Sequence, residues 1–427
     1  MKLISKAAMA TALALGGVAM LGAPATAAKK EKKEEGPKLE MSNEFRKPAG
    51  EAQAALAAND LATAKAKITE AAALAKNPDE KYVSAQILLQ IGLQSKDEAV
   101  QSEAITAMID SGRVPAADLP KFKFYAGKFA YDKKDYAKSK ALLTEAEQAG
   151  YTGTDLYLLL AEANANSGAA PQGLGYIEKA IAAEKAAGKP VPEEWYKRGI
   201  SIAYQAKLMP EVAKWTRLNV QAFPTPENWR TALVIYRDNT NLDNQSMLDL
   251  MRLMRLTKSL AGERDYFEYA NSAFERGIYG EAKSVIDEGK AGGMLNTSNQ
   301  AISDVYTQAS SKIAADKKEL AAAEREASTS NNFRVASGTA DALMGYGEDA
   351  RAIPLYKIAL QKGATDKDTI NTRIGIASVR SGNIAGAREA FAQVNASGPR
   401  GPLVSYWTLY LDQRGGGATA SAAPTGN

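Results

Sequence analysis

The sequence predicts an all-α protein built as a solenoid of paired antiparallel helices, and three observations lead to that prediction. The first is an internal repeat of 34 residues, in which Gly127 is followed by Ala161 and Ser139 by Gly173. The second is a template of three small residues, in which the middle residue stands twelve positions after the first and the last stands seven positions after the middle one. The third observation is a residue suited to a tight turn, which stands between the first and the middle small residue of the template. A 34-residue period with two helices per repeat is typical of an α-solenoid.

The template has a physical cause, because small side chains let two antiparallel helices approach closely. It recurs along the chain at Ala52/Ala64/Ala71, Ala270/Ala282/Gly289, Ala340/Ala352/Ala359 and Gly375/Ala387/Val394. Five positions before the second small residue, we expect a left-handed residue just past the first helix, which favours glycine. That position holds Asn59 and Lys134 in two repeats and glycine in four others, at Gly168, Gly277, Gly347 and Gly382.

The repeats carry part of a known motif, W-x2-L-G-x2-Y followed by A-x3-F and then P. Trp229 and Tyr236 match its first part, Ala387 and Phe391 its second, and Pro224 its third. On these residues the chain resembles tetratricopeptide repeat (TPR) proteins of an exported bacterial type over residues 47–399. The resemblance implies a right-handed superhelix of about nine to ten helix pairs. It also implies that the concave face, lined by the first helices, captures a protein or peptide.

The amino-acid composition excludes several classes of catalytic and metal site. The 427 residues include no cysteine and no histidine, which excludes disulfides, thiolate metal sites and histidine-based catalysis. The formal net charge of +4 does not suggest nucleic acid. The sequence Gly345 to Ala350 fits a loose dinucleotide fingerprint, but it falls on a turn between helices rather than after a strand. We therefore predict no cofactor and no metal, while a pair of carboxylates serving a glycosidase stays open.

The N-terminal residues 1–28 have the features of a secretory signal peptide. Lys2 and Lys6 precede an apolar stretch from Ala7 to Leu21, and Ala25 to Ala27 form a small-x-small cleavage site. Cleavage would leave Ala28 or Lys29 as the first residue and no transmembrane anchor. We therefore expect export, to a bacterial periplasm, by the general secretion route.

The expected organisation follows the repeats and the breaks between them. Met247 to Leu260 carries apolar residues at helical spacing, which indicates a buried helix face. Residues 297–332 are degenerate and form either a helix pair or one longer helix. The full set of segments is a signal peptide at 1–28, a charged linker at 29–46, repeats 1–2 at 47–113, repeats 3–7 at 120–296, the degenerate segment at 297–332, repeats 8–9 at 333–399, a capping helix at 400–413 and a disordered tail at 414–427.

Function is predicted from the resemblance and from the absence of catalytic motifs. The leading hypothesis is a non-catalytic interaction scaffold of the cell envelope that captures a protein or peptide partner in its concave face. One alternative is an enzyme acting on envelope polysaccharide, such as peptidoglycan or another glycan. Another alternative is a subunit of outer-membrane assembly or secretion.

The family's groove positions, carried over repeat by repeat, select candidate partner-binding residues. They are Phe124, Lys128, Tyr131, Tyr196, Arg230, Arg237, Phe267, Asn271 and Phe274. Arg230 and Arg237 are seven apart and so lie on one helix face. Because a buried arginine needs an opposite charge, these two predict a partner with an acidic segment.

Overall fold

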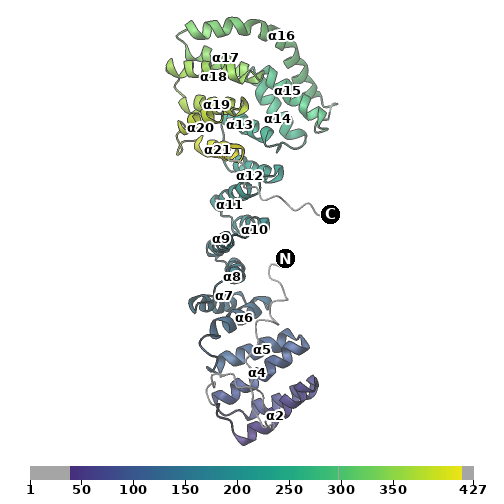
Figure 1. The fold of residues 1–427 in the computed structure, drawn as a ribbon. Helices are drawn as coiled ribbons and strands as arrows, with labels where there is room; N and C mark the ends of the chain where they lie inside the picture. The colour runs from purple at the N-terminus through teal and green to yellow at the C-terminus, as the bar shows by residue number, and fades with distance from the viewer. Residues whose placement is uncertain (1–38, 297, 416–427) are drawn as a thin grey trace, which may run out of the picture. The chain divides into compact units, whose positions relative to one another are not determined.

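The computed structural model describes residues 39–296 and 298–415, and within them every regular element is a helix. Twenty helices, α2 to α21, follow one another in this part of the chain, mostly as antiparallel neighbours (Figure 1). The predicted all-α solenoid of about nine to ten helix pairs is therefore confirmed. The signal peptide at 1–28, most of the charged linker and the end of the predicted tail lie outside the described residues.

The chain divides after Lys207 into two compact units. The first unit contains four successive helix pairs and a further helix, and each pair packs mainly on the next. Its helices are α2 (Asn43–Ala57), α3 (Leu61–Leu74), α4 (Pro78–Ser95), α5 (Glu98–Asp110), α6 (Leu119–Asp132), α7 (Tyr136–Gln148), α8 (Thr154–Asn166), α9 (Ala170–Ala186) and α10 (Glu193–Gln205).

The second unit begins at Leu208 and contains eleven described helices. They are α11 (Met209–Ala222), α12 (Pro226–Asp238), α13 (Asn244–Leu256), α14 (Gly262–Glu275), α15 (Tyr279–Ala291), α16 (Gln300–Thr329), α17 (Phe333–Gly345), α18 (Asp349–Gln361), α19 (Lys367–Arg380), α20 (Ile384–Ala392) and α21 (Gly401–Gly415).

The turn and contact residues of the template are where the sequence places them. All six predicted turn residues have a positive φ, from 60° at Asn59 to 82° at Gly168. The small residues lie at close helix contacts: Ala64, Ala282 and Ala352 are fully buried. At Gly375 an added Cβ would come within 2.1 Å of the Phe391 ring, so no larger residue fits there without movement. The 34-residue template thus marks the contact between the two helices of a repeat.

The second unit differs from the first because its last helix returns to its first ones. α21 packs on α20 and also contacts α11, α13 and α19. Arg217 of α11 donates to Ser405 at 2.6 Å, and Gln413 donates to the carbonyl of Val220 at 2.9 Å. α13 lies inside this arrangement, beside α14 on one side and α19 on the other (Figure 1). The predicted capping helix therefore closes the unit on itself instead of covering only the last repeat.

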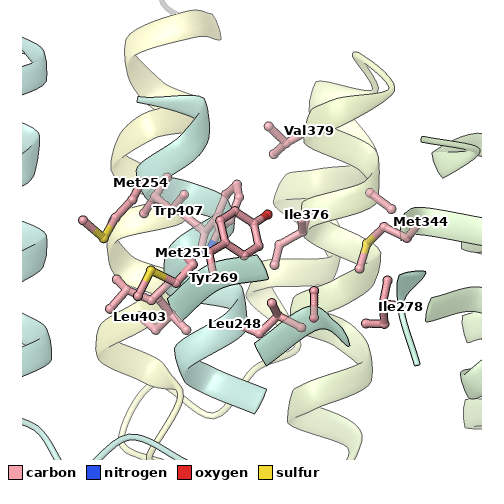
Figure 2. Close-up of a cluster of buried hydrophobic side chains, with 14 of the residues drawn as sticks. Leu248, Met251, Met254, Tyr269, Ile278, Met344, Ile376, Val379, Leu403 and Trp407 are labelled. Carbon is pink, nitrogen blue, oxygen red and sulfur yellow. The ribbon is translucent and has the colours of Figure 1, made fainter. Parts of the chain in front are cut away.

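Apolar side chains from these distant segments share one core. Leu248, Met251 and Met254 of α13 meet Trp407 of α21 and Ile376 of α19 (Figure 2). Each of these five side chains is fully buried. The buried face predicted for Met247 to Leu260 is confirmed, and besides the neighbouring α12 and α14 its partners include α19 and α21, more than a hundred residues away in sequence.

The structure changes one predicted segment boundary and decides between the two alternatives that the sequence left open for residues 297–332. The linker predicted to reach residue 46 ends earlier, because α2 begins at Asn43. Ser42 accepts a hydrogen bond from the Phe45 amide at 3.3 Å and Phe45 is fully buried, so this helix start is capped and anchored. The degenerate segment at 297–332 contains one helix of 30 residues, α16. None of the helices in the described ranges combines the length and the apolar character needed to cross a bilayer.

Candidate functional site

A buried cluster of charged side chains lies in the second unit and joins helices that are distant in sequence. Asp249 on α13 is fully buried and accepts hydrogen bonds from Arg252 at 2.8 Å and Arg400 at 2.7 Å. Arg373 on α19 places its Nε 3.9 Å from the same carboxylate. Burial alone would raise the pKa of Asp249, but the charges of Arg373, Arg400 and Arg252 outweigh burial and lower it. We call these four residues the Asp249 hub.

Two further carboxylates complete the charge balance around the hub. Glu281 on α15 accepts two hydrogen bonds from Arg252, at 2.9 and 2.6 Å, and a third from the Tyr269 hydroxyl at 2.6 Å. Burial acts to raise the pKa of Glu281, but the charge and hydrogen bonds of Arg252 bring it to about 2. Asp341 on α17 accepts two hydrogen bonds from Arg373, at 2.9 and 2.7 Å. The hub therefore fixes the positions of α13, α15, α17 and α19 relative to one another.

Beside the hub lies a hollow of about 730 Å³, which we call the basic hollow. Its walls come from α13, α14, α15, α16, the end of α17 and the end of α19. The lining includes three carboxylates and twice as many basic residues, namely Arg252, Arg255, Lys258, Lys283, Lys317 and Arg380. A volume of this size suits a small ligand or a few side chains of a peptide.

The charges in the basic hollow do not cancel. Each lining carboxylate already has a cation: Glu281 has Arg252, Glu288 accepts from Arg255 at 2.6 Å, and Asp287 from Lys283 at 2.6 Å. Of the other three basic residues, Arg380 pairs with Asp349 at 3.2 Å outside the lining. The two exposed lysines, Lys258 and Lys317, form no ion pair with any residue that the structure describes. The hollow therefore presents unmatched positive charge to an incoming anionic group.

An aromatic ring and a helix start also contribute to the hollow. The Lys317 ammonium lies 5.0 Å from the centre of the Tyr346 ring, which places that charge over the ring face. Gly280 allows the ring to sit there, since a Cβ at this position would come within 2.4 Å of Tyr346. Gly280 is in the first turn of α15, which no side chain caps. The free amides of that turn add partial positive charge to the same side of the hollow.

The candidate groove residues of the first unit are mostly engaged within the chain. Phe124 and Tyr196 are buried, only 4% and 3% exposed, so their rings serve inter-helix packing. Lys128 forms an ion pair with Asp132 at 2.9 Å. Tyr131 is half-buried and accepts a hydrogen bond from Asn166 at 3.3 Å; burial, aided by the nearby Glu162 charge, raises its pKa to about 12.

The two arginines that predicted an acidic partner have an acidic partner inside the chain. Arg230 and Arg237 both pair with Asp265 on α14, the second at 3.5 Å. Arg230 also donates to the Ser259 carbonyl at 2.9 Å. The reasoning that a half-buried arginine needs an opposite charge is correct, but Asp265 supplies that charge. These two positions therefore give no independent support for an acidic partner.

The remaining candidates lie together on α14. Phe267 and Phe274 are half-buried and pack against the core of the second unit, and Asn271 donates to Glu275 at 2.8 Å. The ring of Phe274 lies 5.8 Å from that of Tyr279, and Lys312 stands 5.6 Å from it. The structure thus places four of the nine candidates in the first unit and five in the second. Their role in partner binding stays a prediction.

Sequence reasoning missed the basic hollow because its residues come from six helices and the turns beside them and share no local motif. Lys258 has a positive φ of 56° in the turn after α13, the second helix of its pair, whereas Lys134, with a φ of 63°, follows α6, the first helix of its pair. The template therefore does not select Lys258. Lys317 lies in α16, which the repeat template fits poorly, so the template could not place it.

Comparisons with known proteins do not identify a relative of the chain. No family model and no curated protein matches the chain. Among solved structures, the TPR domain of P58(IPK) matches at 11% identity, covering 88% of this chain and 99% of that one, with a TM-score of 0.24. Yeast Tom70 matches at 11% identity over 87% and 88%, with a TM-score of 0.21. The pentatricopeptide repeat protein PPR10 from maize matches at 14% identity over 88% and 54%, with a TM-score of 0.29. At these values the assignment of a TPR-like solenoid rests on the helix pairs and turns described above.

Proposed function

We propose that the protein is a non-catalytic interaction scaffold of the cell envelope that holds a protein or peptide partner by an acidic segment. The observation that carries the proposal is the surplus of positive charge in the basic hollow, where Lys258 and Lys317 lack an internal anion. A carboxylate-bearing segment of a partner would supply the missing anion. Exposed charges are worth little singly, so several contacts are needed for a modest affinity. A dissociation constant of ~1 μM corresponds to about −8 kcal/mol.

The chemistry of the carboxylates favours binding over glycan hydrolysis. A glycosidase needs one acid whose pKa is raised so that it keeps its proton at neutral pH. In the basic hollow, Asp287 and Glu281 have lowered pKa values because, although burial acts to raise them, Lys283 and Arg252 outweigh it. An ionised, paired carboxylate is a poor general acid. The envelope location is part of this proposal and rests on the signal-peptide features of residues 1–28.

A charge-reversal experiment tests the proposal. Partners are crosslinked in intact cells to the parent protein and to a Lys258→Glu/Lys317→Glu variant. The control variant, Lys138→Glu/Lys185→Glu, changes the net charge equally at two exposed lysines of the first unit. We expect the hollow variant to lose the partner and the control to keep it, with the crosslinked partner peptides rich in Asp or Glu. Equal capture by all three proteins, or turnover of peptidoglycan by the parent, would contradict the proposal.

A further inference from the structure

A second hollow, of about 500 Å³, lies in the second unit between α18 and α20 and over α19. We call it the outer groove. Asn371, Ile374 and Ser378 of α19 form its floor, and they follow one another at helical spacing of three and four residues. Arg373 and Ile376 lie on the opposite side of α19, toward the hub and the shared core. The outer groove is therefore separate from the basic hollow, with which it shares no lining residue.

Two polar side chains on the groove floor have no partner. Asn371 is 9% exposed and Ser378 is 1% exposed, and neither side chain forms a hydrogen bond with the residues that the structure describes. Both side chains line the hollow, so their donors and acceptors are available to a ligand that enters it. Asn371 offers both a donor and an acceptor, which is the pair that one peptide group requires.

The spacing of these side chains fits an extended chain. Seven residues of helix separate Asn371 from Ser378, a rise of about 10.5 Å along the axis. Three residues of an extended strand span about 10 Å. Two peptide groups three residues apart could therefore meet both side chains. Ile374 lies between them on the floor, next to Ile353 and Leu360 of α18, and would receive an apolar side chain.

The charge at the rim indicates which peptide fits. Lys357 and Lys367 are exposed at the groove and form no ion pair with any described residue, and one glutamate, Glu389, faces them. We propose that the outer groove binds an extended peptide segment through its backbone, with an apolar side chain over Ile374 and an acidic one beside the two lysines. This site does not depend on the function proposed for the basic hollow.

The test uses the full chain and a defined probe, the fluorescently labelled capped peptide acetyl-Glu-Val-Thr-Val-Thr-amide. The matched control peptide has the same sequence with N-methyl groups on the two valine nitrogens. It keeps every side chain but lacks two backbone hydrogen-bond donors. Binding is followed by fluorescence anisotropy for the parent and for an Asn371→Ala/Ser378→Ala variant. A second variant, Gly386→Leu, fills the groove, and its new side chain meets the Asn383 side chain that caps the start of α20. Gln148→Ala, at the exposed end of α7 in the first unit, is the control for loss of a polar side chain.

We expect saturable binding that weakens at least fivefold with N-methylation and with either groove variant, while Gln148→Ala binds like the parent. Melting curves verify that each variant is folded, and either groove variant alone suffices for the test. The proposal is overturned by equal binding of the N-methylated peptide, by full binding in both groove variants, or by no saturable binding to the parent. Stronger competition by an acidic amphipathic helical peptide would also overturn it, because a helix has no free backbone groups to offer.

Discussion

The two units use charge in opposite ways. In the first unit, ion pairs lie at the surface or between adjacent repeats, as with Lys128 and Asp132, or Arg198 and Glu162. In the second unit, Asp249 and its arginines are buried and join residues as far apart as 151 positions, the separation of Asp249 and Arg400. A simple solenoid has contacts only between neighbouring repeats. The second unit has long-range contacts in addition to those between neighbouring repeats, and these contacts form a shared buried core.

This difference predicts different unfolding behaviour. A chain of repeats with neighbour contacts can open locally from its ends, because each repeat loses only one or two interfaces. Closing α21 onto α11 and α13 makes the second unit resemble a globular domain, in which losing one contact exposes a shared core. Three of the four tryptophans, Trp215, Trp229 and Trp407, lie in the second unit, so tryptophan fluorescence reports mainly on it.

The largest effect is expected from Asp249→Leu. This change leaves Arg252, Arg373 and Arg400 buried without the carboxylate between them. Removing one partner of a buried ion pair typically costs about 3–5 kcal/mol. Denaturant titration followed by tryptophan fluorescence should show that loss, while hydrogen exchange in α2 to α9 stays like the parent. An unchanged fluorescence midpoint would mean that the hub does not hold the second unit together.

Much of the fold could be predicted because the repeat template is local. Small residues at fixed offsets and a left-handed turn residue, such as Gly168 or Lys134, are set by contact between the two helices of one repeat. The closure of the second unit could not be predicted, because Asp249 and Arg400 carry no shared pattern in sequence. A charged residue inside an apolar helix face, as Asp249 is among Leu248, Leu250 and Met251, indicates a buried partner but not where that partner is.

The next largest loss of stability is expected from Arg230→Glu/Arg237→Glu. Sequence reasoning alone treats these arginines as free groove residues whose reversal would leave the melting temperature nearly unchanged. The Asp265 carboxylate between them has a side chain only 3% exposed, so the double variant would place two like charges against a buried anion. We expect the melting temperature to fall by several degrees, since ~1 kcal/mol shifts it by about 2–4 °C in a domain of this size. If calorimetry shows no change, the pairing with Asp265 contributes nothing, and these arginines would again be candidates for a partner.

Ala282→Arg tests the template itself. Ala282 is fully buried at the contact between α14 and α15, whereas Ala315 on α16 is exposed. Overpacking alone costs roughly 1–3 kcal/mol, and burial of the new charge adds to that. Ala315→Arg should change the free energy of unfolding by no more than about 0.5 kcal/mol. Equal losses in the two variants, measured by denaturant titration, would show that the small-residue positions are not the helix contacts.

The candidate site was harder to predict than the fold, and for a related reason. The basic hollow draws Lys258 from a turn, Arg380 from the end of α19 and Lys317 from the middle of α16. Only the three-dimensional arrangement tells which of the many lysines and arginines have an internal carboxylate and which do not. Arg237 was selected from its position in the repeat, but its charge is matched by Asp265, whereas Lys317 was not selected and its charge is unmatched.

Acid should weaken the second unit through Glu281. Its pKa is about 2 in the folded protein against 4.5 for the free side chain, because Arg252 outweighs the effect of burial. A lowered folded pKa contributes stability that is complete above about pH 4.5 and is lost as the pH falls toward 2. The pKa of Asp249 is also lowered, so it acts in the same direction, while that of Asp349, raised by burial, acts against them. Glu281→Gln should flatten the dependence of the tryptophan-monitored midpoint on pH in this window; an identical slope in parent and variant would exclude Glu281 as its source.

The smallest effect is expected from Lys128→Gln in the first unit. Lys128 pairs with Asp132 four residues later on α6, and its side chain keeps about a fifth of its exposure, while that of Asp132 keeps nearly half. Such helix-surface pairs contribute about 0.3–0.5 kcal/mol at low salt, and ions screen them within ~10 Å at 0.1 M. Glutamine keeps most of the side-chain stem but removes the ammonium, which pairs with Asp132 and lies 5.6 Å from the centre of the Phe129 ring. We expect a shift in the free energy of unfolding below about 0.5 kcal/mol that disappears in high salt, measured by hydrogen exchange in α6 and α7. A loss comparable to that of Asp249→Leu would mean that the first unit also depends on a charged centre, and the contrast between the units would fail.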